Sequence, residues 1–163
     1  MIQPNPKVFC NSPWFELNIL WNGDLAFCCQ QRETIYDMQT PNPYNIRSMT
    51  LKEWYNSEPM QQARLKMFEQ ERWSKCTQCW QEEAVGDSSR RHRQNQKSIL
   101  FRQEFQNSFE QSPNYKLFEN SLEQGGQTYD PPVDLHIDLG NHCNLACKMC
   151  WPGASTTIAS KMK

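Results

Sequence analysis

Three cysteines near the carboxyl end of the chain, Cys143, Cys147 and Cys150, are separated by three residues and then by two. Thiolates at this C-x3-C-x2-C spacing can hold three corners of one iron-sulfur cube, whereas such clusters are ordinarily held by four cysteines. No fourth cysteine follows closely in the sequence. The segment is therefore expected to form a loop around a metal cluster with one iron left for another ligand, such as a substrate.

The composition bounds the size of the core and the kind of partner. The chain has 163 residues, which is typical of one domain, but its 37% hydrophobic content and mean hydropathy of -0.84 are low for one large core. We therefore expect small, loosely joined units. Seventeen Lys and Arg residues nearly balance 18 Asp and Glu residues, so the charge gives no argument for a nucleic-acid or membrane partner, and we expect neither.

The cysteine content bears on the cellular compartment. The sequence has no apolar stretch long enough to span a membrane, and its start lacks the basic-then-apolar layout of a signal peptide. We therefore expect a cytoplasmic protein. Eight cysteines, most of them in short C-x2-C or C-x3-C runs, then predict metal ligation rather than disulfides.

Local patterns predict a hairpin and two helices in the first half. Apolar runs at residues 15–21 and 24–29 flank Asn22-Gly23, which favours a type I′ turn between two antiparallel strands. Thr50 and Glu53 have the spacing of a capping box and predict a short helix. Ser57 is expected to cap a second helix that extends to about Gln70.

The remainder of the chain contains a turn-rich segment and one further strand. A polar stretch from Trp80 to about Phe109 predicts helix interrupted at Gly86-Asp87. Residues 125–132 contain the pairs Gly125-Gly126 and Pro131-Pro132, which neither a helix nor a sheet tolerates. Apolar and polar residues alternate from Val133 to Leu139, which is strand periodicity. Ser155 or Thr156 is expected to cap a final helix.

The strand and the cysteine loop together resemble the radical S-adenosylmethionine (radical SAM) superfamily, through the local form C-N-L-x-C-x-M-C. The resemblance covers about the last thirty residues. It implies that Cys143, Cys147 and Cys150 hold a four-iron four-sulfur cluster, that S-adenosylmethionine chelates the fourth iron, and that Met149 lies near the adenine. It further implies reductive cleavage to a 5′-deoxyadenosyl radical, with a reductant such as flavodoxin or ferredoxin. A zinc knuckle or an electron-transfer cluster is the alternative, but both normally use four closed ligands.

A second set of cysteines lies in the first half of the chain. Cys10, Cys28, Cys76 and Cys79, with the spacing G-x-L-x-x-C before Cys28, resemble the twitch or SPASM-type auxiliary domain of radical SAM enzymes over residues 10 to about 92. The resemblance implies that these four thiolates ligate an auxiliary four-iron four-sulfur cluster, shielded by Trp14, Trp54, Trp73 and Trp80. Four thiolates also suit zinc.

The neighbouring Cys29 competes with Cys28 for the role of ligand. Adjacent residues on a strand point to opposite faces, so both cannot easily bind one iron. We favour Cys28 from the glycine spacing. The order of the two sites departs from the family, in which the auxiliary domain usually follows the radical core.

A basic run, which contains Arg90, Arg91, Arg93 and Lys97, follows the second set of cysteines. It could grip a carboxylate or phosphate, but acidic residues lie just upstream, and we interpret the run as the solvated face of a helix.

These patterns combine into one hypothesis. We expect an α+β auxiliary domain of a β-hairpin plus helices at residues 1–92, a helical connector and turn-rich linker at 93–132, and the first β/α unit of a radical SAM partial (β/α) barrel at 133–163. The chain would be the early part of a longer enzyme, inactive by itself, that modifies a peptide or related small molecule. The alternative is a non-enzymatic iron-sulfur or zinc protein for electron transfer or interaction.

Overall fold

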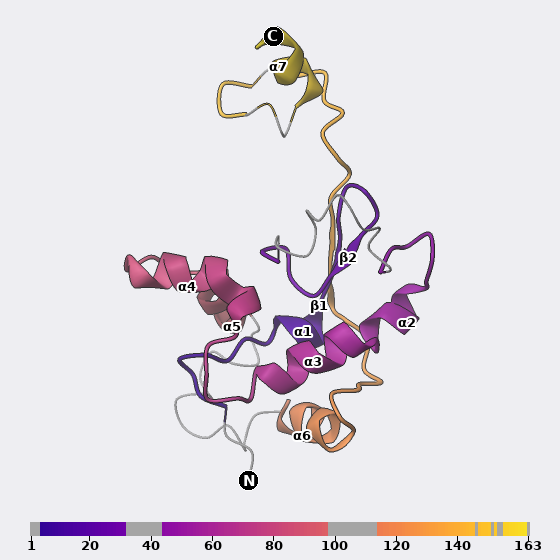
Figure 1. The fold of residues 1–163 in the computed structure, drawn as a ribbon, viewed down its shortest axis with the longest axis vertical. Helices are drawn as coiled ribbons and strands as arrows, with labels where there is room; N and C mark the ends of the chain where they lie inside the picture. The colour runs from indigo at the N-terminus through magenta and orange to yellow at the C-terminus, as the bar shows by residue number, and fades with distance from the viewer. Residues whose placement is uncertain are drawn as a thin grey trace.

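The structure, a computed structural model, describes residues 4–31, 44–97, 114–145, 147–150, 152 and 155–162 (Figure 1). It is a mixed α/β structure with one small three-stranded sheet and several helices. In chain order the elements are α1 (Ser12–Phe15), β1 (Glu16–Ile19), β2 (Leu25–Ala26), α2 (Leu51–Tyr55), α3 (Glu58–Lys66), η1 (Ser74–Cys76), α4 (Thr77–Ala84), α5 (Arg90–Lys97), α6 (Tyr115–Glu123), β3 (Asp134–Ile137) and α7 (Thr156–Lys161).

The predicted hairpin is present, but its turn differs from the prediction. β1 pairs antiparallel with β2, with Ile19 opposite Leu25. The N–H of Gly23 donates to the carbonyl of Leu20 at 2.8 Å. Gly23 has φ +87°, whereas no residue other than glycine has a positive φ in the described chain, and this includes Asn22. A type I′ turn needs positive φ at two central positions, so the prediction of that turn was wrong. The connection is the three-residue kind, with its left-handed residue at glycine.

Two helices follow as their capping residues predict. The Thr50 hydroxyl accepts from the Glu53 N–H, and the Glu53 carboxylate accepts from the Thr50 N–H at 2.7 Å, which completes the capping box at the start of α2. Ser57 is the N-cap of α3, although its side chain makes no capping hydrogen bond there. Met60 and Ala63 are fully buried on α3.

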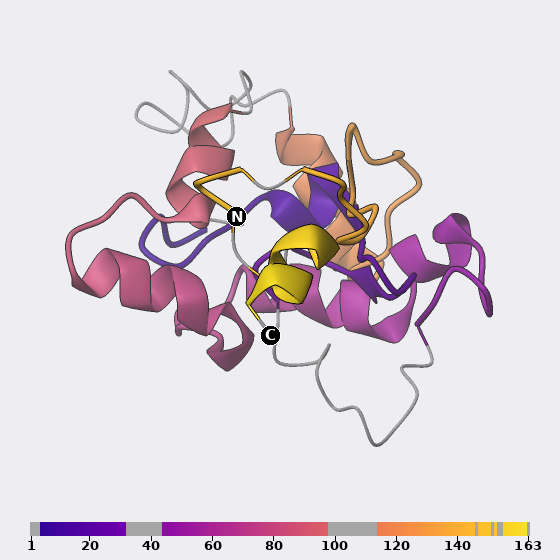
Figure 2. The same ribbon diagram turned by 90° about the horizontal axis from the view of Figure 1, so that it is seen from above.

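The core has two adjoining parts that α3 joins. One packs the sheet residues Leu17, Ile19 and Leu25 against α2 and α3. The other is aromatic, and in it Trp14 meets Phe118 of α6 edge to face at 4.9 Å. Seen from above, α4 and α5 lie on the opposite side of this body from α2 (Figure 2).

A fully buried arginine ties this core together. Arg64 of α3 is 0% exposed and donates to the carbonyls of Pro13, Tyr55 and Gly126 at 3.0, 2.7 and 2.8 Å. Gly126 has φ +90°, and a Cβ there would lie 2.5 Å from the main-chain oxygen of Gln61. Only glycine fits this turn, which brings its carbonyl to Arg64.

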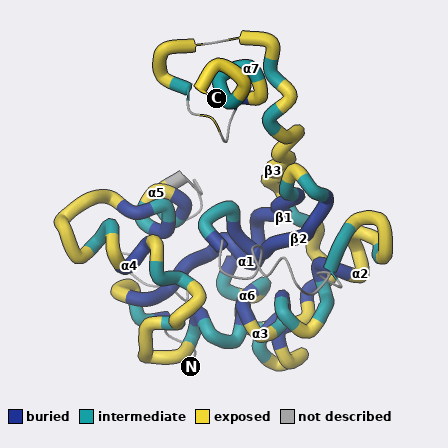
Figure 3. The backbone as a smooth tube through the Cα atoms, turned by 45° about the horizontal axis from the view of Figure 1, so that its top comes forward, coloured by how far each residue is buried: buried dark blue, intermediate teal, exposed yellow. Residues whose placement is uncertain are grey.

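The strand predicted at 133–139 pairs with the first unit. β3 lies parallel to β1, with Leu135 opposite Leu17 and Ile137 opposite Ile19, and it forms one edge of the sheet in the order β2-β1-β3. All four β3 residues are exposed. Beyond it the chain runs away from the body and ends in α7, where most of the chain is exposed or half-buried (Figure 3). Ser155 caps α7 as predicted.

One predicted feature falls partly outside the described residues. The polar stretch from Trp80 forms α4 and α5, with Gly86 at φ +84° between them, but its continuation beyond Lys97 lies outside that part of the chain. In the described ranges no helix is long and apolar enough to cross a membrane.

Candidate metal-binding sites

Four cysteines from separate segments line one pocket. Cys10 precedes α1, Cys28 follows β2, Cys76 ends η1 and Cys79 lies in α4. Three of them are buried and Cys76 is half-buried, and all are free thiols. The fold thus brings together the four residues that the sequence predicts as ligands, although they are distant in the chain.

The pocket has the donor side chains of a metal site, but these side chains are not arranged around one metal-binding point. Its free space is about 20 Å³, room for about one water molecule. Among the residues that the structure describes, no group of three or more His, Cys, Asp or Glu side chains surrounds a point where a metal ion would bind. A four-iron cluster is larger than this space, so the cysteine side chains and the pocket walls would have to move to admit one. The donor set fits an iron-sulfur cluster, because four thiols converge there without a carboxylate in the lining.

Burial keeps these thiols protonated when no metal is bound. It raises the pKa of Cys10 to about 11 and that of Cys76 to about 12, and for Cys76 the nearby Cys10 and Cys79 sulfurs add to the effect. Burial also raises the pKa of Cys79. A cysteine binds a metal as the thiolate, so metal binding must release these protons. The positive charge of the metal stabilises the thiolates, which the apolar surroundings alone do not.

Cys28 and Cys29 lie in a turn rather than in a strand. β2 ends at Ala26, and the N–H of Gln31 donates to the Cys28 carbonyl at 3.1 Å. The argument from strand alternation therefore does not apply to this pair. Cys28 lines the pocket. A hydrogen bond from the Cys28 thiol, with a further contribution from Arg90, lowers the pKa of Cys29 to about 7, while the same bond and burial raise that of Cys28.

Three cationic side chains, from Lys75, Arg90 and Arg91, line the same pocket. Arg91 is 3% exposed and forms a bidentate pair with Glu83 at 2.9 and 2.8 Å. It also donates to the carbonyls of Pro6 and Phe9. The interpretation of the basic run as a solvated face was wrong for Arg91 and for Arg90, which pairs with the buried Glu16 at 2.7 Å. The sequence signal for this was Glu83, eight residues before Arg91, on the preceding helix.

The four tryptophans predicted to shield a cluster pack in different parts of the fold. Trp73 stacks on Phe27, which lines the pocket, with ring centroids 5.0 Å apart. Trp80 donates its ring N–H to the Trp73 carbonyl at 2.8 Å. Trp54 is buried in the part of the core that contains the sheet residues, and Trp14 is buried in the aromatic part. None of the four tryptophans is among the residues that line the pocket, so their shielding of a cluster stays a prediction.

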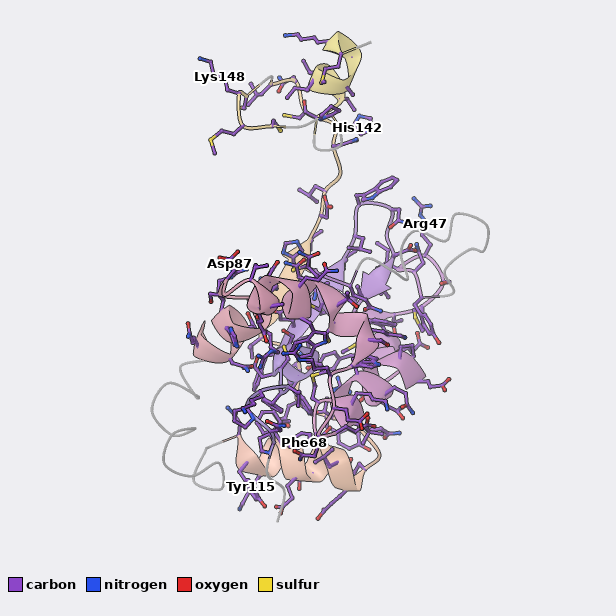
Figure 4. All side chains as sticks on the ribbon, turned by 60° about the vertical axis from the view of Figure 1, so that its left-hand side comes forward. Arg47, Phe68, Asp87, Tyr115, His142 and Lys148 are labelled. Carbon is purple, nitrogen blue, oxygen red and sulfur yellow. The ribbon has the colours of Figure 1, made fainter. Side chains whose placement is uncertain are left out.

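The second cysteine set lies in the loop between β3 and α7, which extends from the body of the molecule (Figure 4, where His142 and Lys148 mark the loop and Phe68 and Asp87 mark the body). Cys143 and Cys150 are half-buried and Cys147 is exposed. The Leu145 N–H donates to the Cys143 sulfur at 3.4 Å, and the Thr157 hydroxyl donates to the Cys143 carbonyl at 2.6 Å. The first bond lies within the loop, and the second ties the loop to the first turn of α7.

The residue predicted to lie near the adenine, Met149, is 98% exposed. The ligand roles of the loop cysteines and the contact of Met149 with a nucleotide stay predictions.

The comparisons with known proteins bear on the first site. Residues 10–80 match the family model for SPASM, described as an iron-sulfur cluster-binding domain. Cys10, Cys28, Cys76 and Cys79 all fall inside this span, which supports an auxiliary domain of the kind associated with radical SAM enzymes. The matched span is less than half of the chain and does not include the loop at 143–150. No curated protein and no solved structure matches the chain.

Proposed function

We propose that this chain belongs to a radical SAM enzyme and carries two iron-sulfur centres, an auxiliary cluster in the four-cysteine pocket and a substrate-binding cluster in the loop at 143–150. The observation that carries the proposal is the convergence of Cys10, Cys28, Cys76 and Cys79 on one pocket within the span that matches an iron-sulfur domain. Four thiolates complete the coordination of such a cluster, so this centre would have no open position for substrate.

The residues around the auxiliary pocket would bind the cluster, exclude water and balance its charge. Phe27, Met67 and Pro13 give the pocket apolar walls. Arg90 and Arg91 supply positive charge to a centre that four thiolates make negative. Because this pocket is lined by side chains from α1, η1, α4 and α5, loading of the cluster would also tie these helices together.

The loop at 143–150 would hold the second centre through Cys143, Cys147 and Cys150. With three protein thiolates, one iron is open to the amino and carboxylate groups of S-adenosylmethionine. When bound, this cofactor pair supplies reductive cleavage of the sulfonium to a 5′-deoxyadenosyl radical. The exposed Met149 would pack on the adenine.

The substrate and the partners follow from the same resemblance. We expect a peptide or related small molecule as substrate, because auxiliary domains of this type recur in peptide-modifying enzymes. A reductant such as flavodoxin or ferredoxin would supply the electron. Eight free cysteines favour a reducing compartment such as the cytoplasm.

Anaerobic reconstitution with iron and sulfide tests the proposal. The chain should turn brown and bind about eight irons, four for each cluster. After reduction with dithionite, S-adenosylmethionine should alter the electron paramagnetic resonance signal of one cluster, and the full-length enzyme should release 5′-deoxyadenosine. Cys147→Ala should abolish the response to the nucleotide and retain about four irons. A colourless protein that binds zinc, or a signal indifferent to the nucleotide, would refute the enzyme assignment.

A further inference from the structure

We infer that Arg90, held by the buried carboxylate of Glu16, is the residue that sets the reduction potential of the four-cysteine centre. The inference rests on the proposed function of that pocket, since it concerns the charge balance of a cluster bound there. It adds a role for two residues that lie outside the cysteine motif.

The first observation is the position of the pair. Arg90 is the first residue of α5 and lines the pocket, while Glu16 begins β1 in the sheet. An Nη of Arg90 donates to Glu16 Oε1 at 2.7 Å, and the side chain of Glu16 is only 2% exposed. A buried carboxylate fixes the guanidinium in one place, so its charge acts at a defined distance from the sulfurs.

The second observation is spare hydrogen-bonding capacity. The Nε of Arg90 is buried and has no hydrogen-bond partner among the described residues. A buried donor without an acceptor is costly, and the sulfurs of a bound cluster are acceptors. The Nε–H is therefore available to donate to a cluster sulfur or to a ligating thiolate once the pocket is loaded.

The other two cations of the pocket differ from Arg90 in this respect. Arg91 uses its guanidinium on Glu83 and on two main-chain carbonyls. Lys75 is exposed, with its ammonium 5.5 Å from the centre of the Trp73 ring, so water screens its charge. Arg90 alone of the three combines a fixed position with a free donor.

This arrangement has a clear effect on electron uptake. A four-cysteine cluster gains one negative charge when a one-electron reductant, dithionite in the test below, reduces it, and no bond to the protein forms or breaks. A fixed positive charge and an N–H donor at the sulfurs both stabilise the reduced state more than the oxidised one, and so raise the potential. The carboxylate of Glu16 opposes part of this effect.

The two residues should therefore shift the potential in opposite directions. Arg90→Gln removes the charge, and we expect the equilibrium to shift at least about tenfold toward the oxidised cluster, or about 59 mV for one electron. Glu16→Gln keeps an acceptor for Arg90 but removes the opposing charge, so the reduced cluster should be favoured. Arg90→Lys keeps the charge and should fall between Arg90→Gln and the unchanged chain. If the two substitutions only loosened the pocket, they would not shift the reduction potential in opposite directions.

The experiment uses the whole chain with Cys143, Cys147 and Cys150 changed to Ala, so that only the first pocket can hold a cluster. Iron content and visible absorption are measured after anaerobic reconstitution, and the potential is measured by a dithionite titration followed by electron paramagnetic resonance. Arg93→Gln is the matched control, because Arg93 lies on the same helix but is exposed. It should leave the potential unchanged.

The outcomes separate the two proposals. If the chain with Arg90 intact binds no iron, the proposed function fails. If it binds iron but Arg90→Gln has the same potential as Arg93→Gln, the inference about Arg90 is overturned and the cluster stands. If Arg90→Gln cannot retain the cluster, Glu16→Gln decides, and a shift toward the oxidised form or no shift overturns the inference.

Discussion

The buried Arg64 gives the sharpest test of the fold. In Arg64→Met an apolar side chain of similar length replaces the guanidinium, so the three carbonyls of Pro13, Tyr55 and Gly126 lose their donors. The variant also loses the contact between the guanidinium and the Tyr55 ring, whose centre lies 4.5 Å away. Arg64 has no carboxylate partner in the described chain that would be left unpaired.

The loss can be estimated from these contacts. Each buried carbonyl without a donor costs about 1.5 kcal/mol and the ring contact contributes about 1 kcal/mol, while release from burying a charged group returns about 2 kcal/mol. The net loss for three carbonyls is then about 3.5 kcal/mol of unfolding free energy. With a urea dependence of about 2 kcal/mol per molar, the midpoint should fall by about 1.7 M.

Urea unfolding of the metal-free chain under reducing conditions, followed by far-ultraviolet circular dichroism, measures this shift. Arg47→Met is the control, because Arg47 is exposed and such changes alter stability by less than about 0.5 kcal/mol. Equal midpoints for the two variants would refute the role given to Arg64. The urea midpoint of Arg64→Lys should lie between those of Arg64→Met and Arg47→Met, because the lysine ammonium cannot donate to all three carbonyls as the forked guanidinium does.

Further predictions concern the turn, the helix cap, a buried phenol and the pocket. Gly126→Ala should destabilise the chain by at least about 2 kcal/mol in the same assay, because positive φ and the Gln61 carbonyl both oppose a Cβ; an unchanged midpoint would contradict this. Thr50→Ala should lower stability by about 1 kcal/mol by removing the cap, which urea unfolding would also detect. Burial raises the pKa of Tyr55 to about 12, above its unfolded value of about 10. Its contribution is therefore complete below pH 10 and should decline by about 2–3 kcal/mol as pH rises through 12, a decline that Tyr55→Phe should remove. Cys76→Ser should lose the auxiliary cluster, whereas Cys29→Ser should retain its iron; the reverse result would reassign the ligands.

The sequence predicted the features that depend on near neighbours. The capping box needs only Thr50 and Glu53, and both hydrogen bonds form. The alternation from Val133 correctly indicated a strand, because strand period is local. The predicted turn type was wrong because Asn22-Gly23 fits both a two-residue and a three-residue loop. The three-residue loop needs a positive φ only at Gly23.

Features that depend on distant partners were not predictable in this way. A pattern cannot show that β3 pairs with β1, because parallel pairing depends on the path of the chain between them. Charge runs are likewise ambiguous. Arg91 and Arg93 belong to the same run, but the fold brings Glu83 and two carbonyls to Arg91 and leaves Arg93 exposed. The four cysteines of the pocket were recognised by spacing, whereas Arg90 and Glu16 carry no motif.

The parallel pairing of β1 with β3 also affects how the molecule should respond to cutting. A protease that cleaved the exposed segment around Tyr129, which is 83% exposed, would produce two pieces that still share main-chain hydrogen bonds, such as that from Asp138 N–H to the Ile19 carbonyl at 2.8 Å. The nicked fragments should therefore co-elute, and separately produced halves should reassociate by strand complementation.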